Sequence, residues 1–398
     1  MGLVYVIGTC DTKGEELRFA CACIRAAGAK PLLVDVSTGT AGADVDVTAA
    51  EVASHHPDGA AAVLSLKDRG QAVSAMAKAL TVFILSRNDL VAVLGLGGSG
   101  NTALVTEAMR ALPLGLPKLM VSTLASGQVA GFVGPTDIAM MHAVVDIAGL
   151  NVISRKIIGN AAHAVAGMTL NAIAPAPQAK RAIGYTMFGV TTACITQIRE
   201  QLEPASQSFV FHATGTGGQS FEKLAESGLL HGVFDITTTE VADYLVGGIL
   251  PCTDDRFGAF IRRPMPYVGS VGAVDMVNFG PRETVPVQYS SRHFHLHNAH
   301  VTLMRTTAAE NVRIGNFIVE RINRMPGPVR FLLPLQGVSA IDKQGQAFHD
   351  PGADQALFDA IRTGWKAAPN HKLIELDCDI NDAAFADAAI AAFNSMSA

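Results

Sequence analysis

A run of glycines between an apolar strand and an amphipathic helix constrains the fold of this chain more than any other feature. Residues 91–96 have the composition of a buried strand, and apolar residues recur at helical spacing from Leu104 to Leu112. Between them lies the polar segment Gly97–Thr102. The first turn of such a helix has unpaired main-chain N–H groups and the positive end of the helix dipole, and glycines leave room for an anion. The stretch predicts a phosphate-binding turn in an α/β fold.

This turn matches neither of the two common phosphate-binding motifs. No lysine follows its last glycine, as a Walker loop requires, and the glycine spacing differs from that of the dinucleotide fingerprint. Glycines at a tight strand-to-helix turn also serve purely structural purposes. The rest of the chain has to decide between the two roles.

Composition limits the class of protein. At 398 residues, 49% hydrophobic and 16% charged, the chain is long enough for two domains with extensive cores. The net charge of −5 has no basic block behind it, so we expect no nucleic-acid partner. No apolar run approaches the ~18 residues of a membrane span, and we expect no membrane association. The six cysteines lack metal-type spacing, which indicates a reduced, cytoplasmic protein.

Strand-like and helical patterns alternate along the whole chain. Leu3–Gly8, a helical segment and Pro31–Asp35 form a βαβ unit, which implies a parallel sheet. The segment Ala172–Lys180 contains two prolines and little to bury, and beyond it the alternation restarts at Ile183. We therefore predict two Rossmann-like, doubly wound subdomains with parallel sheets and an interdomain cleft. The N-terminal subdomain would span residues 1–178, and the C-terminal one residues 179–398.

Polar loops follow four of the predicted strands, at the edge where open α/β sheets bind ligands. Two of them are glycine-rich, and the second begins after the strand that ends at His212. From these loops we predict nucleotide contacts by Thr9, Asp11, Thr12, Lys13, Gly97, Gly98, Ser99, Gly100, Asn101, Thr102, Ser122, Thr123, Thr214, Gly215, Thr216, Gly217 and Gly218.

Lys13 is the most informative side chain of the first loop. It falls in the first turn of a predicted helix, where a cation is unfavourable unless an anion binds nearby. Either a ligand neutralises it or it points into solvent. Asp11 and Thr12 either cap this helix, which we favour, or hold a hydrated Mg²⁺. Asp35, at the end of the second strand, is placed either as a ribose-hydroxyl acceptor or as a solvated carboxylate.

Two candidate proton carriers lie in the C-terminal half. His212 ends a strand before a glycine loop, a position suited to acid–base catalysis or phosphate contact, although a histidine bonded within the core is an equal alternative. Glu240 could also carry a proton, but Thr237 and Glu240 have the spacing of a capping box, and we favour the cap.

The stretch from Gly280 to Val301 reads as a long loop. In an extended chain His293, His295 and His297 would share one face, so a metal site is conceivable. We favour a loop over the cleft, with Arg292 or His297 touching the ligand. Arg305 is a candidate for an anion pocket just before a helix that Thr307 and Glu310 could cap.

Several motifs together resemble the ATP-binding domain family of the tomato mosaic virus resistance protein. The resemblance covers nearly the whole chain. Its principal motifs are Gly8–Lys13, Gly95–Thr102, Val121–Gly127, Phe211–Gly218 and Asp235–Glu240, and it extends to Val145–Asn151, Asp275–Phe279, His297–Asn298 and Thr302–Arg305. The resemblance implies two Rossmann-like subdomains, binding of ATP with Mg²⁺, and a homodimer. The plant protein carries a further C-terminal barrel domain that this chain lacks, so its antiviral role is not transferred.

These observations lead to one principal functional expectation. We expect an ATP-dependent enzyme that acts on a small, acidic metabolite in the cleft, with His212, Lys13 and His297 as catalytic residues. One alternative is a nucleotide-sensing binding protein without catalysis. Another is an enzyme like the sugar-nucleotide epimerases or transferases, for which fold analogy is the only support.

Overall fold

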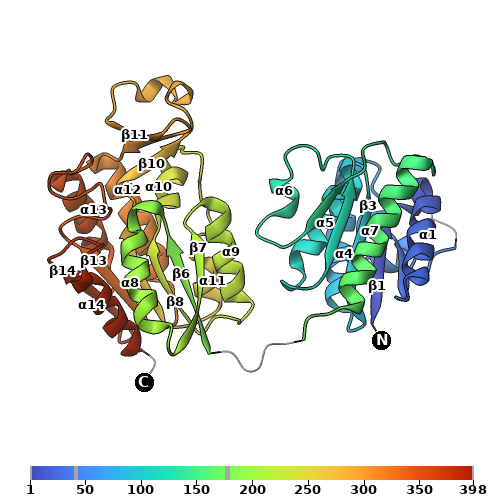
Figure 1. Cartoon of the computed structure of the whole chain (residues 1–398), viewed down its shortest axis with the longest axis horizontal. Coiled ribbons are helices and arrows are strands. Elements are labelled where there is room, and N and C mark those ends of the chain that lie inside the picture. Colours follow the sequence, from blue (N-terminus) through green and yellow to red (C-terminus); the bar gives the residue numbers. More distant parts are fainter. Residues whose placement is uncertain (1, 40–43, 175–179, 397–398) are drawn as a thin grey trace. The chain divides into compact units, whose positions relative to one another are not determined.

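The computed structural model describes residues 2–39, 44–174 and 180–396, which form two compact units, Met1–Pro175 and Ala176–Ala398 (Figure 1). The predicted boundary between residues 178 and 179 lies outside the described residues. Each unit is a parallel sheet with helices on both faces. The predicted fold class, two Rossmann-like doubly wound units, is confirmed.

Unit 1 is built on a five-stranded parallel sheet with the strand order β2-β1-β3-β4-β5. Because this order reverses direction between β1 and β3, the loops that leave these two strands diverge and open a crevice at their carboxyl ends. The strands are β1 (Leu3–Gly8), β2 (Pro31–Asp35), β3 (Leu90–Gly97), β4 (Lys118–Ser122) and β5 (Ala139–His142). The helices are α1 (Cys10–Ala26), α2 (Ala49–Ala53), α3 (Ala61–Leu64), α4 (Arg69–Leu85), α5 (Ser99–Ala111), α6 (Ala130–Val133) and α7 (Val152–Leu170).

Alternating side chains of each buried strand supply two cores, one on either face of this sheet. In β1, Val4 and Val6 pack with the apolar side chains of α1 and α7. Tyr5 and Ile7 point to the opposite face and pack with α4 and α5. This period-two alternation explains why a continuous apolar run forms a strand that is buried on both sides.

Unit 2 repeats the doubly wound arrangement with six parallel strands in the order β14-β13-β9-β8-β6-β7. The strands are β6 (Arg181–Met187), β7 (Ser206–His212), β8 (Gly232–Thr237), β9 (Tyr267–Gly272), β13 (Val329–Pro334) and β14 (His371–Leu376). The helices are α8 (Thr192–Leu202), α9 (Gly215–Glu226), α10 (Thr239–Val246), α11 (Gly258–Arg262), α12 (Ala308–Ile322), α13 (Pro351–Gly364) and α14 (Ala383–Asn394), with 3₁₀ turns η1 (Gly189–Thr191), η2 (Arg282–Thr284) and η3 (Val287–Tyr289).

Helices α8 and α14 cover one face of the unit 2 sheet, where Tyr185 and Phe234 stack with ring centroids 5.3 Å apart. The single tryptophan of the chain, Trp365, follows α13. Its ring centroid lies 6.2 Å from those of Phe331 and His371.

Unit 2 also contains a small antiparallel sheet that the sequence did not predict. Its strands are β10 (Met276–Phe279), β12 (Val301–Arg305) and β11 (Phe294–Asn298), in the order β10-β12-β11 (Figure 1). The stretch from Gly280 to Val301, predicted as a loop, thus contains an edge strand. Pro281 and Pro286 lie shortly before this strand, and because prolines are typical of loops, they favour the prediction of one long loop over that of a short strand.

The predicted cap of α1 by Asp11 and Thr12 is wrong, because among the described residues no side chain caps the start of this helix. The helix begins at Cys10 with Thr9 as its N-cap, and Lys13 has non-helical backbone angles, φ −133° and ψ 21°, within it. The hydroxyl of Thr12 lies 3.1 Å from that of Thr9. Lys13 therefore occupies a kink near the start of α1.

Candidate functional site

The loops after β1 and β3 share one cavity of about 580 Å³ at the carboxyl edge of the unit 1 sheet. This is the point where the strand order reverses, and ligands of open α/β folds bind there. Its lining residues are Thr9, Asp11, Thr12, Lys13, Val36, Thr38, Gly39, Leu66, Lys67, Arg69, Ala72, Val73, Gly98, Ser99, Gly100, Asn101, Leu104 and Asp146. Eight of the residues predicted to contact a nucleotide lie in this lining.

The N-terminus of α5 forms one wall of the cavity. Gly98 is its N-cap and supplies no side-chain hydrogen bond, so the N–H groups of Ser99 and Gly100 keep the unpaired state of a helix start. Asn101 is 7% exposed, and its Nδ2 donates to the carbonyl oxygen of Leu96 at 2.6 Å. Its Oδ1 is buried and has no partner among the described residues.

The glycines of this turn differ in what requires them. A Cβ on Gly97 would lie 2.6 Å from the Cβ of Asn101, so the fold itself requires a glycine there. A Cβ on Gly98 would meet its nearest atom, the Thr123 hydroxyl oxygen, at 3.8 Å, and one on Gly100 would meet Val73 at 4.0 Å. These are ordinary contacts, so packing does not require glycine at these two positions in the cavity wall.

A buried carboxylate organises the β1–α1 turn. Asp35 is 1% exposed, and its Oδ1 accepts hydrogen bonds from the Cys10 and Ser37 main-chain N–H groups at 3.0 and 2.9 Å. The Ser37 hydroxyl also donates to it, and the N–H of Asp11 donates to that hydroxyl at 3.1 Å. Neither expectation for Asp35, a ribose acceptor or a solvated carboxylate, is correct, because its oxygens are engaged inside the fold.

Lys13 lies in the cavity wall and contacts a main-chain acceptor. Its Nζ donates to the carbonyl oxygen of Ile147 at 2.5 Å. The same loop is also tied to α1 by the N–H of Gly149, which donates to the buried carboxylate of Glu16 at 2.6 Å. Of the two alternatives for Lys13, a side chain free in solvent is therefore wrong, and a bound anion would compete with the Ile147 carbonyl.

A strained turn directly after β5 places Asp146 in the cavity wall. Val144 has φ +64°, and the N–H of Val145 donates to the carbonyl oxygen of Ala143 at 2.7 Å. This is a three-residue γ-turn of the rare, strained kind, unusual for a β-branched residue. It reverses the chain directly after β5, so that Asp146 lines the cavity two residues later.

Three charged residues of the cavity escaped the sequence reasoning: Lys67, Arg69 and Asp146. Lys67 and Arg69 flank Asp68, the N-cap of α4, whose carboxylate accepts from the Gln71 N–H at 2.8 Å. The argument used for Lys13, a cation at a helix start, applies equally to Arg69 and would have found it. Asp146 lies in one of the motifs that carry the family resemblance, but no local pattern marks it as a site residue.

Two predicted contacts in this region are buried away from the cavity. The hydroxyls of Thr102 and Ser122 lie 2.7 Å apart, and both residues are fully buried. The Ser122 hydroxyl also accepts from the N–H of Leu124 at 3.0 Å. Gly97, Thr102, Ser122 and Thr123 do not belong to the lining of this cavity among the described residues, and their predicted nucleotide contacts remain predictions.

The second glycine-rich turn, at the start of α9, faces protein atoms. A Cβ on Gly217 would lie 1.9 Å from the His212 carbonyl oxygen, and one on Gly215 would lie 2.0 Å from that of Pro251. The N–H of Gly215 donates to Leu250, and the N–H groups of Gly217 and Gly218 donate to the hydroxyl and the carbonyl oxygen of Thr214. Thr214 is the N-cap, and Thr216 is exposed. This turn therefore has few free donors, and its predicted nucleotide contacts remain predictions.

Beneath this turn lies a buried ion cluster. Arg256 donates to Glu240 at 2.8 Å, to Glu222 at 2.9 Å and to Asp235 at 2.7 Å, and Tyr267 donates to Asp235 at 2.8 Å. Glu240 is fully buried, its Oε2 has no partner among the described residues, and burial raises its pKa to about 7 against the opposing effect of Arg256. The predicted capping box is wrong: α10 begins at Thr239, and Glu240 serves this cluster instead.

Of the candidate histidines of unit 2, His212, His293 and His297 are exposed, and His295 is half-buried. His212 ends β7, and its ring stacks on Phe188 with centroids 4.9 Å apart, so it is not bonded within the core. His297 lies in β11 at a register shift. The rings of His293 and His295 lie nearly perpendicular to that of Phe348, with centroids 5.4 and 6.2 Å away. Within residues 2–39, 44–174 and 180–396 no group of three or more potential metal ligands comes together.

Arg292 and Arg305 are each neutralised by protein carboxylates. Arg292 forms a bidentate pair with Glu310, at 2.9 and 2.7 Å, and Thr307 and Glu310 form the predicted capping box. Arg305 is buried between Asp342 and Asp354, at 3.0 and 2.7 Å. The expectation that Arg305 joins an anion pocket is wrong, because these carboxylates already occupy its guanidinium group.

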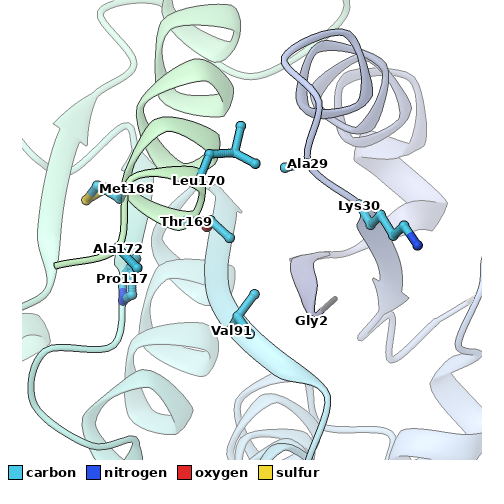
Figure 2. Close-up of a pocket in the computed structure, with 9 residues that line it drawn as sticks. All are labelled: Gly2, Ala29, Lys30, Val91, Pro117, Met168, Thr169, Leu170 and Ala172. Atoms are coloured by element: carbon cyan, nitrogen blue, oxygen red, sulfur yellow. The ribbon is translucent and has the colours of Figure 1, made fainter. Parts of the chain in front are cut away.

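A second cavity, of about 220 Å³, lies at the amino edge of the unit 1 sheet, opposite the strand ends that carry the first (Figure 2). It is lined by Gly2, Ala29, Lys30, Val91, Pro117, Met168, Thr169, Leu170 and Ala172. Most of these side chains are apolar, and Lys30 is the only charged group in this lining. The cavity lacks the convergent polar groups of a ligand site.

A search of the described residues finds no helix that is both long and apolar enough to cross a membrane.

Comparison with known proteins places the chain in a family. Profiles of the uncharacterised protein family UPF0261 match it over residues 2–174, for the N-terminal domain, and residues 180–397, for the C-terminal domain. A solved C2-type ketoreductase from a modular polyketide synthase has a TM-score of 0.24 and 15% identity over 94% of this chain and 80% of that chain, a likeness too distant to carry an argument.

Relatives match along the whole chain. A UPF0261 protein of Rhizobium meliloti is 54% identical over 99% of this chain and 98% of its own length. Another from Clostridium tetani is 42% identical over 96% of both chains. The ToMV resistance protein Tm-1(GCR237) of Solanum lycopersicum is 41% identical over 98% of this chain, which spans 55% of the tomato protein. The chain belongs to the uncharacterised protein family UPF0261.

Proposed function

We propose that unit 1 binds ATP, with Mg²⁺, in the cavity between the β1 and β3 loops. The observation that carries this proposal is the uncapped start of α5, which opens into a cavity of about 580 Å³ at the point where the strand order reverses. A cavity of this size is in the range of known small-molecule sites, about 300–1,000 Å³. The N–H groups of Ser99 and Gly100 would hold a phosphate.

The cavity offers groups suited to each part of the ligand. Apolar side chains at Val36, Leu66, Val73 and Leu104 provide a surface for a base. Asp11 and Asp146 carry carboxylates, the ligand type that Mg²⁺ takes from proteins while it keeps waters and phosphate oxygens. When bound, Mg²⁺ would neutralise phosphate charge, and the chain's own part is to supply these two carboxylates.

The reaction that we propose is an ATP-dependent transfer to a small, acidic metabolite. Lys13 would hold and orient a phosphate, because its ammonium group lies in the cavity wall. His212 and His297, at exposed positions of unit 2, are the proposed proton carriers.

Isothermal titration of the purified protein with ATP and Mg²⁺ tests the binding, and incubation with pools of sugar acids and other carboxylates tests the reaction. We expect saturable binding and metabolite-dependent release of ADP or AMP. Tight binding without turnover across the pools would favour a nucleotide-sensing protein instead. Failure to bind ATP at millimolar concentration would refute the proposal, and a preference for uridine nucleotides would point to sugar-nucleotide chemistry.

A further inference from the structure

We infer that Lys67 and Arg69 bind the outer phosphates of the nucleotide, so that affinity for this cavity rises with the number of phosphates. This inference rests on the proposed function and adds to it a pair of specificity-determining residues. Lys67 lies between α3 and α4, Arg69 is the first residue of α4, and both line the cavity that also contains the start of α5.

The first line of support is that these two cations lack protein partners. In the part of the chain that the structure describes, neither side chain forms a hydrogen bond or ion pair with protein. Asp68, which lies between them, uses its carboxylate to cap α4. In unit 2, by contrast, Arg292 and Arg305 are saturated by carboxylates. A ligand anion in the cavity would therefore neutralise the two cations that have no protein partner.

The second line of support is the position of Arg69. It is the first residue of α4, where the helix dipole disfavours a positive charge. An anion bound in the cavity would lie between this guanidinium group and the N–H groups of α5. The start of α5 and the cations at two other helix starts, Arg69 of α4 and Lys13 of α1, would then converge on one polyphosphate.

The third line of support is a buried polar atom in the same wall. Asn101 is 93% buried and lines the cavity, yet its Oδ1 has no partner among the described residues. A buried acceptor without a donor is costly, and a bound ligand or its ordered water would satisfy it. The lining carries three cations against two carboxylates, and with Mg²⁺ on those carboxylates its net positive charge would match a di- or triphosphate better than a monophosphate.

The experiment compares ATP, ADP, AMP and inorganic tripolyphosphate by calorimetry on the full chain, at fixed Mg²⁺ and ionic strength. The variants are Lys67→Met, Arg69→Met and the double variant. Lys78→Met, an exposed cation on α4 outside the cavity lining, is the matched control. Thermal melts confirm that each variant is folded.

For the wild type we expect affinity in the order ATP, ADP, AMP. Each single variant should lose about tenfold in ATP affinity, the double variant about a hundredfold, and AMP binding should change less than about threefold. Tripolyphosphate should compete with ATP on the wild type only. If the variants lose all three nucleotides equally, or lose none, the assignment of these residues is wrong while ATP binding stands. A wild type that binds no nucleotide overturns the proposed function and this assignment together.

Discussion

At the scale of single residues, we expect the positive charge of Lys13 to contribute to the affinity of the cavity for an anion. Its ammonium group is held by the Ile147 carbonyl, so the lysine is already in the wall before a ligand arrives. Replacement by methionine keeps the aliphatic stem and removes the charge. We expect Lys13→Met to weaken ATP binding about tenfold, roughly 1.4 kcal/mol, with the fold intact.

Calorimetry measures this effect, and Lys30→Met provides the control. Lys30 lies in the wall of the opposite, mostly apolar cavity of the same unit (Figure 2). Its replacement should leave ATP affinity unchanged. Equal affinity of wild type and Lys13→Met would remove Lys13 from the site.

Gly100 and Gly217 allow a glycine that leaves room for a ligand to be distinguished from a glycine that packing requires. A Cβ at Gly100 has 4.0 Å of clearance, whereas one at Gly217 would collide with the His212 carbonyl oxygen at 1.9 Å. We expect Gly100→Ala to change the free energy of unfolding by less than about 1 kcal/mol, and Gly217→Ala to lower it by about 3 kcal/mol.

Urea denaturation gives the two stabilities, and calorimetry gives ATP binding by Gly100→Ala. The added methyl group projects from the cavity wall, so we expect binding to weaken although the protein is as stable as the wild type. A stable Gly217→Ala variant, or normal ATP affinity in Gly100→Ala, would contradict this distinction.

At the scale of elements, local sequence predicts strands and helices well where one pattern is uninterrupted. The β1 and β2 strands have the bounds that their patterns indicate, Leu3–Gly8 and Pro31–Asp35. The β9 strand, Tyr-Val-Gly-Ser-Val-Gly, was missed, because its two glycines weaken the strand pattern although neighbouring strands bury it completely.

The candidate site could be predicted only in part for a related reason. The turns at Gly97 and Gly215 look alike in sequence, yet the first adjoins the cavity of about 580 Å³, whereas the second faces protein carbonyl groups. The difference lies in the carbonyl groups of Leu250 and Pro251, which are distant in sequence and occupy the second turn. Lys67 and Asp146 were missed because the fold brings their segments together and no local pattern marks them, whereas Arg69 could have been found as a cation at a helix start.

At the scale of the whole molecule, unit 2 carries buried acids that make its stability depend on pH. Burial raises the pKa of Glu240 from 4.5 to about 7, and that of Asp243 from 3.8 to about 6. The folded state therefore binds more protons than the unfolded state between these values, and stability falls as pH rises. For Glu240 alone the loss between pH 4 and pH 8 is about 3 kcal/mol.

We expect urea unfolding of unit 2 to require less denaturant at pH 8 than at pH 5, and Glu240→Gln to flatten this dependence. Glutamine keeps an oxygen for Arg256 but cannot ionise. Glu226→Gln, on an exposed pair with Arg262, is the control and should leave the slope unchanged. A Glu240→Gln slope equal to that of the wild type would show that this carboxyl group does not titrate in the range.

The fluorescence of Trp365 reports on one half of the molecule and not on the other. The only indole among 398 residues lies in unit 2, beside Phe331 and His371, while the proposed nucleotide cavity belongs to unit 1. Its emission during denaturation follows one half alone. A change in that emission when nucleotide is added would mean that filling one half alters the other, which makes communication between the halves visible without a label.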